Sequence, residues 1–307
     1  MSRDLSIEHA DFVFFSTSRT MNSRLWFVNN AQLHYMILAY LARYQEMYGV
    51  VIYAFIIMGN HFHLLAKFPK KNKAKFFKNF NWMITKLTNT HVEQFEGGRL
   101  WGRPARSQIV ADDEAVKNRF FYTALNPVRA GLCKDISGYN GYNSFNDAVT
   151  GRQRTFKIFH RHDYSNRKRY NAKLTREDCM TEHTLVFSRL PGYEGLSQKA
   201  YAELLRNELS DRTKQVVKER KDENKGFANK QSLRTIERGA KPRTTKTSAR
   251  NSKRPVIFAS TSELKKQMLE WYFDLVARYR VASQKFRAGA LNVIFPDGTY
   301  RPFLQVS

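Results

Sequence analysis

Two histidines and one tyrosine are the residues of this sequence whose types and spacing could support catalysis. His61 and His63 are separated by Phe62, and on a β-strand such residues point to the same face. Imidazole is the commonest neutral metal ligand, so the pair can form half of a divalent-metal site. Taken alone, the same spacing is more typical of structural or surface histidines.

Tyr122 is the third of these residues, and it lies in the segment DDEAVKNRFFYTALNP, residues 112–127. At 100° per residue the tyrosine falls opposite the middle of the apolar helical stripe, where the core does not need it. Asn126 follows four residues later, so both side chains can serve one site. Pro127 either ends the helix at Asn126 or makes that asparagine the cap of the next turn. An ordinary exposed tyrosine is the competing interpretation.

A metal ion beside a tyrosine is a suitable combination for nuclease or transesterase chemistry. The ion would polarise a scissile phosphodiester as a Lewis acid, and the tyrosine hydroxyl would attack it as a covalent nucleophile. The sequence lacks a GxxxxGK[ST] phosphate loop, so we expect no nucleotide cofactor.

The elements that must position these residues lie in the first half of the chain. Gly59-Asn60 marks a tight turn between two strands, and Asn72 is a suitable N-cap for the long helix that follows. The acidic residues at 112–114 favour the N-terminus of another helix. The expected elements are strand 12–16, helix 31–48, strands 50–57 and 61–68, helix 72–95, a short strand ending at 110, and a helix from 112.

This β-α-β-β-α-β-α order predicts an α+β fold, namely a ferredoxin-like split βαβ domain with an antiparallel sheet and one extra helix. We expect the rest of the chain to form a basic, mainly helical C-terminal extension that binds DNA or a partner. The expected parts are a catalytic domain at 1–151, a basic helical extension at 152–211, a basic flexible linker at 212–254, and a helical segment with a short hairpin at 255–307.

Charge is the most unusual feature of the composition, with 52 Lys and Arg against 27 Asp and Glu and a net charge of +25. Residues 1–150 hold 18 basic and 11 acidic side chains, whereas residues 151–307 hold 34 and 16. This excess points to a polyanionic partner, nucleic acid first and anionic membrane second. Two cysteines, Cys133 and Cys179, exclude a disulfide framework and the cysteine-rich zinc modules.

Membrane insertion and secretion are not expected from the sequence. The most apolar run, residues 50–58, is too short to span a bilayer, and the first residues lack a signal-peptide pattern. We therefore expect a cytoplasmic protein that associates with the nucleoid when it binds DNA.

Two segments about 60 residues apart, MGNHFHLL at 58–65 and YTALNPVRAGL at 122–132, carry a family resemblance. Together they resemble the REP-associated tyrosine transposases, which belong to the single-tyrosine HUH transposases. GRLWGR at 98–103 and GYNGYNSFNDAVTG at 138–151 fall where that family has similar glycine- and aromatic-rich segments. The resemblance covers about residues 8–151.

The resemblance implies a metal-dependent transposase or endonuclease that cleaves and rejoins single-stranded or hairpin DNA. His61 and His63 take the place of the metal ligands, and Asn126 that of the polar residue that completes metal binding. Tyr122 takes the place of the nucleophile, which would form a 5′-phosphotyrosine and leave a free 3′-OH. The implied ion is Mg²⁺ or Mn²⁺, which accept an asparagine oxygen as a ligand better than zinc does. The protein would be a monomer or a homodimer.

Basic side chains near these motifs are candidate contacts to the DNA backbone, although each can equally be a solvated charge. Two departures from the family pattern are a Gly-Asn turn in place of the common Pro-Asn and the segment ARSQIVADDE at 105–114, which differs from the family's more usual charged pattern. Trp101 and Tyr53 could stack on unpaired bases, and they are equally suited to the core. The candidate DNA contacts are Arg19, Lys67, Arg103, Arg119 and Arg129.

Three other functions are compatible with parts of this pattern. A domesticated protein that binds hairpin DNA with little or no catalysis would not need His61, His63, Tyr122 and Asn126 together. A replication initiator or relaxase would usually carry a helicase or a second tyrosine arrangement, and neither is evident. A metal hydrolase that activates water is disfavoured because no carboxylate lies beside the histidines in the sequence.

Overall fold

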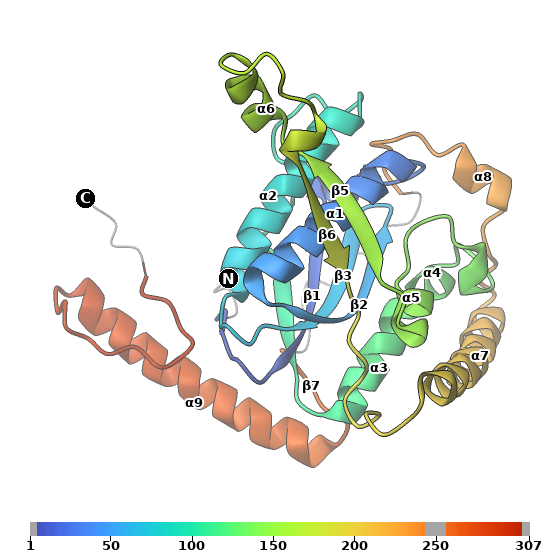
Figure 1. Cartoon of the computed structure of the whole chain (residues 1–307). Helices are drawn as coiled ribbons and strands as arrows, with labels where there is room; N and C mark the ends of the chain where they lie inside the picture. Colours follow the sequence, from blue (N-terminus) through green and yellow to red (C-terminus); the bar gives the residue numbers. More distant parts are fainter. Residues whose placement is uncertain (1–4, 243–255, 303–307) are drawn as a thin grey trace.

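The computed structural model of this chain describes residues 5–242 and 256–302. Its core is a five-stranded sheet, and Figure 1 shows helices packed around it. The strands of this sheet are β1 (Val13–Arg19), β2 (Val51–Met58), β3 (His61–Lys67), β4 (Arg106–Val110) and β7 (Ile257–Phe258), and the helices against its faces are α1 (Ala31–Tyr48), α2 (Lys73–His91) and α3 (Asp113–Ala124).

The sheet has the strand order β2-β3-β1-β4-β7. β1 pairs antiparallel with β3 and β4, β2 pairs antiparallel with β3, and β7 runs parallel to β4. With α1 and α2 as the crossovers, the first four strands form the ferredoxin-like split βαβ arrangement. The α+β fold predicted from the element order is confirmed, and β7 is an addition that the order did not predict.

Local signals in the sequence account for α1. Asn30 accepts a hydrogen bond from the Leu33 amide and so caps the N-terminus of the helix. Gly49 adopts a left-handed conformation with φ of 63° and ends it. The observed bounds, Ala31–Tyr48, are those that the apolar spacing predicts.

Strand β3 separates the two layers of helices, because its side chains alternate between the faces of the sheet. Phe62 faces α2, where its ring centroid lies 5.5 Å from that of Phe80. His63 faces α3 on the other side, with its ring centroid 5.9 Å from that of Tyr122. Both faces of the strand are therefore buried, the first by an aromatic core and the second by α3.

The cap of α2 differs from the prediction. Asn72 precedes the helix but its side chain makes no capping hydrogen bond. The carboxylate of Glu8 instead accepts hydrogen bonds from the Lys73 and Ala74 amides, at 2.8 and 2.7 Å. A residue distant in the sequence thus satisfies the free amides of this helix end.

The chain beyond residue 125 adds shorter elements around this core. In Figure 1, α7 lies beside α4 and α5, and α9 runs along the side of the sheet that carries β7. These elements are α4 (Asn126–Arg129), α5 (Phe145–Thr150), β5 (Arg154–Phe159), α6 (Arg161–Lys168), β6 (Met180–Leu185), α7 (Gln198–Asp222), α8 (Lys230–Arg234) and α9 (Ser262–Arg287), and single 3₁₀ turns occur at Met21–Ser23, Ile136–Gly138 and Glu177–Cys179.

Residues 152–211 are not wholly helical as expected. β5 and β6 form a separate two-stranded antiparallel sheet that packs on α1. Phe156 and Ile158 of β5 are buried while Lys157 between them is exposed, which is the alternation of a strand with one covered face.

The expectation of a flexible linker at 212–254 is wrong for the portion that the structure describes. Residues 212–222 continue α7, whose buried Leu209 and Val216 show that the helix has a packed face. Residues 230–242 contact the body through Asn29, whose amide donates to three backbone carbonyls there. The remainder, residues 243–254, lies outside the described residues, and the four domain boundaries stay predictions.

The hairpin expected near residue 297 is also wrong. A turn forms at Asp297-Gly298, but the segments beside it are not strands. Contacts with the first part of the chain hold this turn: the Glu8 amide donates to the Gly298 carbonyl and Lys71 pairs with Asp297. Among the helices of the described ranges, none combines the length and the apolar character needed to cross a bilayer.

We predict that Glu8→Ala lowers the free energy of unfolding by about 3 kcal/mol, because it leaves two helix amides and the buried Lys73 without their acceptor and counter-charge. Equilibrium urea denaturation would measure this change. Asp11→Ala is the control, since the Asp11 side chain is 79% exposed and its loss should cost less than about 0.5 kcal/mol. Equal midpoints for the two variants would contradict this role of Glu8.

Candidate active site

The two histidines of β3 lie side by side and are buried. His61 is 8% exposed and His63 is 6% exposed, and their ring centroids are 4.8 Å apart. They share the face of the sheet that α3 covers, as the strand spacing predicts. Burial excludes surface histidines and leaves structural histidines as the competing interpretation.

Each imidazole has one nitrogen fixed by a neighbouring polar side chain. His61 Nδ1 lies 2.6 Å from Asn60 Oδ1, which also accepts from Arg19 Nη1 at 3.2 Å. His63 Nδ1 lies 2.7 Å from Thr17 Oγ1 on the paired strand β1. Because an amide oxygen can only accept, Nδ1 of His61 carries the proton and its Nε2 keeps a lone pair.

Burial keeps both rings neutral. It lowers the pKa of His63 to about 3, and the positive charges of Arg19 and Arg119 act in the same direction. The pKa of His61 is also held well below its usual value, first by burial and then by His63 and Arg19. A neutral imidazole is the form that binds a metal, so the pair keeps this form throughout the physiological range.

Asn126 reaches the histidines because the helix breaks before it. α3 ends at Ala124, and Asn126 is the first residue of the short helix α4, with Pro127 at its second position. The Asn126 side chain is buried, with Nδ2 3.2 Å from His63 Nε2. The direction of this side chain, which the sequence left open, is thus toward the imidazoles.

Tyr122 packs against the same cluster from α3. Its ring meets Phe15 and His63 edge-on, with centroid distances of 5.6 and 5.9 Å. The tyrosine is half-buried, which excludes the freely exposed tyrosine of the helical-wheel argument. No hydrogen bond to its hydroxyl is found within the described part of the chain, so the oxygen is not committed to a structural contact.

The basic candidates occupy different places. Arg119 lies over the Tyr122 ring, with its guanidinium carbon 4.9 Å from the centroid, and Arg129 follows on α4. Arg19 lies opposite His61 in the β1–β3 register, and the exposed Arg103 follows the strand-like contact of Trp101 with Thr20.

Lys67 and the two aromatic candidates lie away from the cluster. Lys67 is at the far end of β3 from His61, where it pairs with Asp11. Trp101 donates from Nε1 to the Asn81 carbonyl and packs on Phe62, and Tyr53 is buried. Trp101 and Tyr53 thus belong to the core, which was one of their two interpretations.

Arg212 and Phe258, both beyond position 151, are among the residues that contact α3, and the sequence did not identify them. Arg212 of α7 donates to Asn118 at 2.8 Å, and Phe258 of β7 lies 4.0 Å from the Arg119 guanidinium carbon. The signal for the first was the spacing of Leu205, Leu209 and Val216, which continues a helical face past residue 211. No local signal identifies Phe258.

We predict that His63→Gln makes stability less dependent on pH. In the wild type the unfolded chain protonates His63 below its ordinary pKa of 6.5 while the folded chain stays neutral to about 3, so stability falls as the pH drops. Removing this group should reduce the loss of unfolding free energy between pH 7 and pH 5 by about 2 kcal/mol. Urea titrations in EDTA at several pH values would measure it.

Leu64→Ala is the control, because it weakens the opposite face of the same strand without removing a titratable group. It should lower stability by a similar amount at each pH. Parallel pH profiles for wild type and His63→Gln would contradict the buried neutral state.

Comparison with known proteins gives distant structural similarity alone. No protein-family model matches the chain, and no curated protein does so. Among solved structures, a REP-associated tyrosine transposase bound to a REP hairpin is similar at a TM-score of 0.39 and 19% identity, over 48% of this chain and 86% of that one. This similarity shows a distant structural relationship.

Proposed function

We propose that this protein is a metal-dependent DNA transposase or endonuclease of the REP-associated tyrosine type. It would cleave and rejoin single-stranded or hairpin DNA without a nucleotide cofactor, as a monomer or homodimer associated with the nucleoid. The observation that carries the proposal is the packing of Tyr122 against His63, which lies beside His61 in a pair of buried, neutral imidazoles. A tyrosine next to ligands for a divalent ion is what phosphotyrosine chemistry requires.

The donor set fits a hard divalent ion. The imidazoles of His61 and His63 would hold Mg²⁺ or Mn²⁺ together with the Asn126 amide, whose oxygen becomes a ligand once the amide group, which turns Nδ2 toward His63 Nε2 in this structure, has rotated. The ion would supply Lewis-acid polarisation of the scissile phosphodiester. Within the described residues, no three His, Cys, Asp or Glu side chains gather to hold a metal. Water or DNA oxygens would therefore complete the coordination, an open arrangement typical of catalytic sites.

Tyr122 would carry out the strand exchange. Its hydroxyl oxygen would form a bond to phosphorus as its proton passes to water. The bond from phosphorus to the 3′ oxygen would break, and that oxygen would take up a proton from water to give a free 3′-OH. The 5′-phosphotyrosine keeps the energy of the broken bond, so a later 3′-OH can reverse the step. Arg119 lies over the tyrosine ring, where its positive charge would stabilise the charge that develops on the phosphate.

A domesticated hairpin-DNA-binding protein is the second candidate, and one observation favours it. Asn126 Nδ2 lies within hydrogen-bond distance of His63 Nε2, so this imidazole is satisfied without any ion. A binder could keep the cluster as a buried polar network that only stabilises the fold.

We predict that the wild type forms a covalent adduct with labelled hairpin DNA from the flanks of its own gene, in the presence of Mg²⁺ or Mn²⁺. Tyr122→Phe removes the nucleophile and His61→Ala a metal ligand, so each should reduce adduct formation at least about 10³-fold. Denaturing gels would measure the adduct, and Tyr40→Phe on the other face of the sheet should leave it unchanged. Tight binding without an adduct in either metal would support the hairpin-binding alternative.

We predict that Thr17→Val weakens metal binding about 10- to 100-fold, because it removes the contact that orients His63. Electron paramagnetic resonance of free Mn²⁺ would measure the affinity. Thr20→Val is the matched control, since this buried hydroxyl donates to the Arg24 carbonyl and contacts neither histidine. Equal Mn²⁺ affinities for the two variants would show that Thr17 does not support the metal site.

A further inference from the structure

A cavity of about 210 Å³ lies between α3, α7 and β7, beside Tyr122. Three arginines line it, Arg119, Arg129 and Arg212, together with Gln215. None of the described residues in its lining is acidic. A small cavity with this lining suits a compact anion.

Arg119 is the arginine of this cavity that is best placed to bind an anion. Its guanidinium carbon lies 4.0 Å from the ring centroid of Phe258 and 4.9 Å from that of Tyr122. Within residues 5–242 and 256–302, no carboxylate or other acceptor pairs with this guanidinium. Burial lowers its pKa, and aromatic rings offset desolvation without accepting hydrogen bonds in the plane of the fork. Its donors remain available to a ligand.

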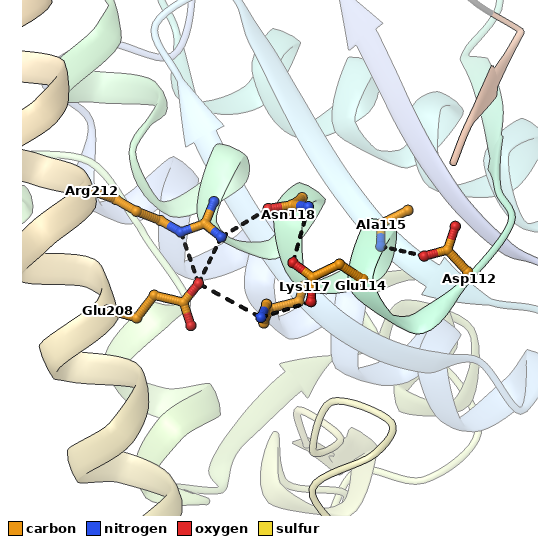
Figure 2. A network of polar contacts seen from close by, with 7 residues as sticks. All are labelled: Asp112, Glu114, Ala115, Lys117, Asn118, Glu208 and Arg212. Atoms are coloured by element: carbon orange, nitrogen blue, oxygen red, sulfur yellow. Dashed lines mark hydrogen bonds and ion pairs between the residues drawn. The ribbon is translucent and has the colours of Figure 1, made fainter. Parts of the chain in front are cut away.

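The Arg212 side chain is held between its own helix, α7, and α3, as Figure 2 shows. Its Nε and Nη2 donate to Glu208 Oε1 at 2.9 and 2.6 Å, and Nη2 also donates to Asn118 Oδ1 at 2.8 Å. Nη1 makes no hydrogen bond within the described part of the chain. The carboxylate thus orients the guanidinium and leaves one nitrogen for an incoming anion.

We infer that this cavity binds a phosphodiester group of the DNA strand, next to the group that Tyr122 attacks. The inference rests on the proposed function and deepens it. Tyr122 lines the cavity whereas His61, His63 and Asn126 do not, so the attacked group and its neighbour have separate places. Guanidinium forks match phosphate oxygens in geometry and charge.

The origin of the lining gives the basic second half of the chain a function. Arg212 and Gln215 come from α7 and Phe258 from β7, all beyond the region of family resemblance. The extension would therefore complete the strand-binding surface around the nucleophile.

The test uses the full chain with Tyr122→Phe as the background, so that only reversible binding is measured. Fluorescence anisotropy with the labelled hairpin DNA at several salt concentrations gives the slope of log affinity against log salt. Arg212→Gln should weaken binding and reduce the slope by about 0.7 to 0.9, the value of one phosphate contact. Gln215→Glu adds a negative charge to the cavity without touching the Arg212 contacts, and should also weaken binding.

Lys214→Gln is the matched control, because it changes the net charge by the same amount at a side chain that is 75% exposed and does not line the cavity. DNA with a single uncharged methylphosphonate, moved through the positions beside the cleavage point, locates the contact. At one position of the methylphosphonate, the DNA should bind less tightly to the protein with an intact cavity. The same DNA should bind Arg212→Gln as tightly as unmodified DNA does.

The inference would be overturned if Arg212→Gln and Gln215→Glu had the same salt slopes and affinities as Lys214→Gln. This holds even if the wild type forms its covalent adduct. A reduced slope for Arg212→Gln without any adduct from the wild type would support the cavity and overturn the cleavage proposal. If no methylphosphonate position weakened binding, the cavity would be a site for free phosphate, and its contact with the DNA strand would be overturned.

Discussion

The central constraint on this structure is that β3 is buried on both faces although one face carries two imidazoles. A buried imidazole must be neutral and hydrogen-bonded, because an unpaired charge or donor there is costly. Thr17, Asn60 and Asn126 meet this requirement, and they come from a neighbouring strand, a turn and a broken helix. The sheet register, the turn and the end of α3 must therefore agree for the cluster to form.

The second half of the chain packs against α3, the helix that carries Tyr122. α7 and β7 both contact α3, and their contacts converge on Arg119, Asn118 and Phe121. The positive charge of the extension is thus distributed over a packed helix as well as over the segment outside the described residues. The polar composition of this segment gave no sign of a packed helix, because a helix with one narrow buried face needs few apolar residues.

Local patterns predicted the parts of the fold that local physics determines. The bounds of α1, the turn at Gly59-Asn60 and the shared face of His61 and His63 follow from spacing, caps and alternation. The cap of α2 could not be predicted, because Glu8 reaches it from 65 residues away. The pairing of β7 with β4 and the position of Arg212 depend in the same way on tertiary contacts. For the site, spacing indicated which residues share a face, and only packing could reveal what holds them neutral.

The parallel pairing of β4 with β7 has a consequence for synthesis on the ribosome. β4 ends at Val110 and its partner begins at Ile257, so one edge of the sheet has no partner while the intervening chain is made. At 5–20 residues per second this interval lasts about 7 to 30 seconds. An open strand edge can pair with other chains during such an interval. For that period the β4 edge of the nascent protein is open to pairing.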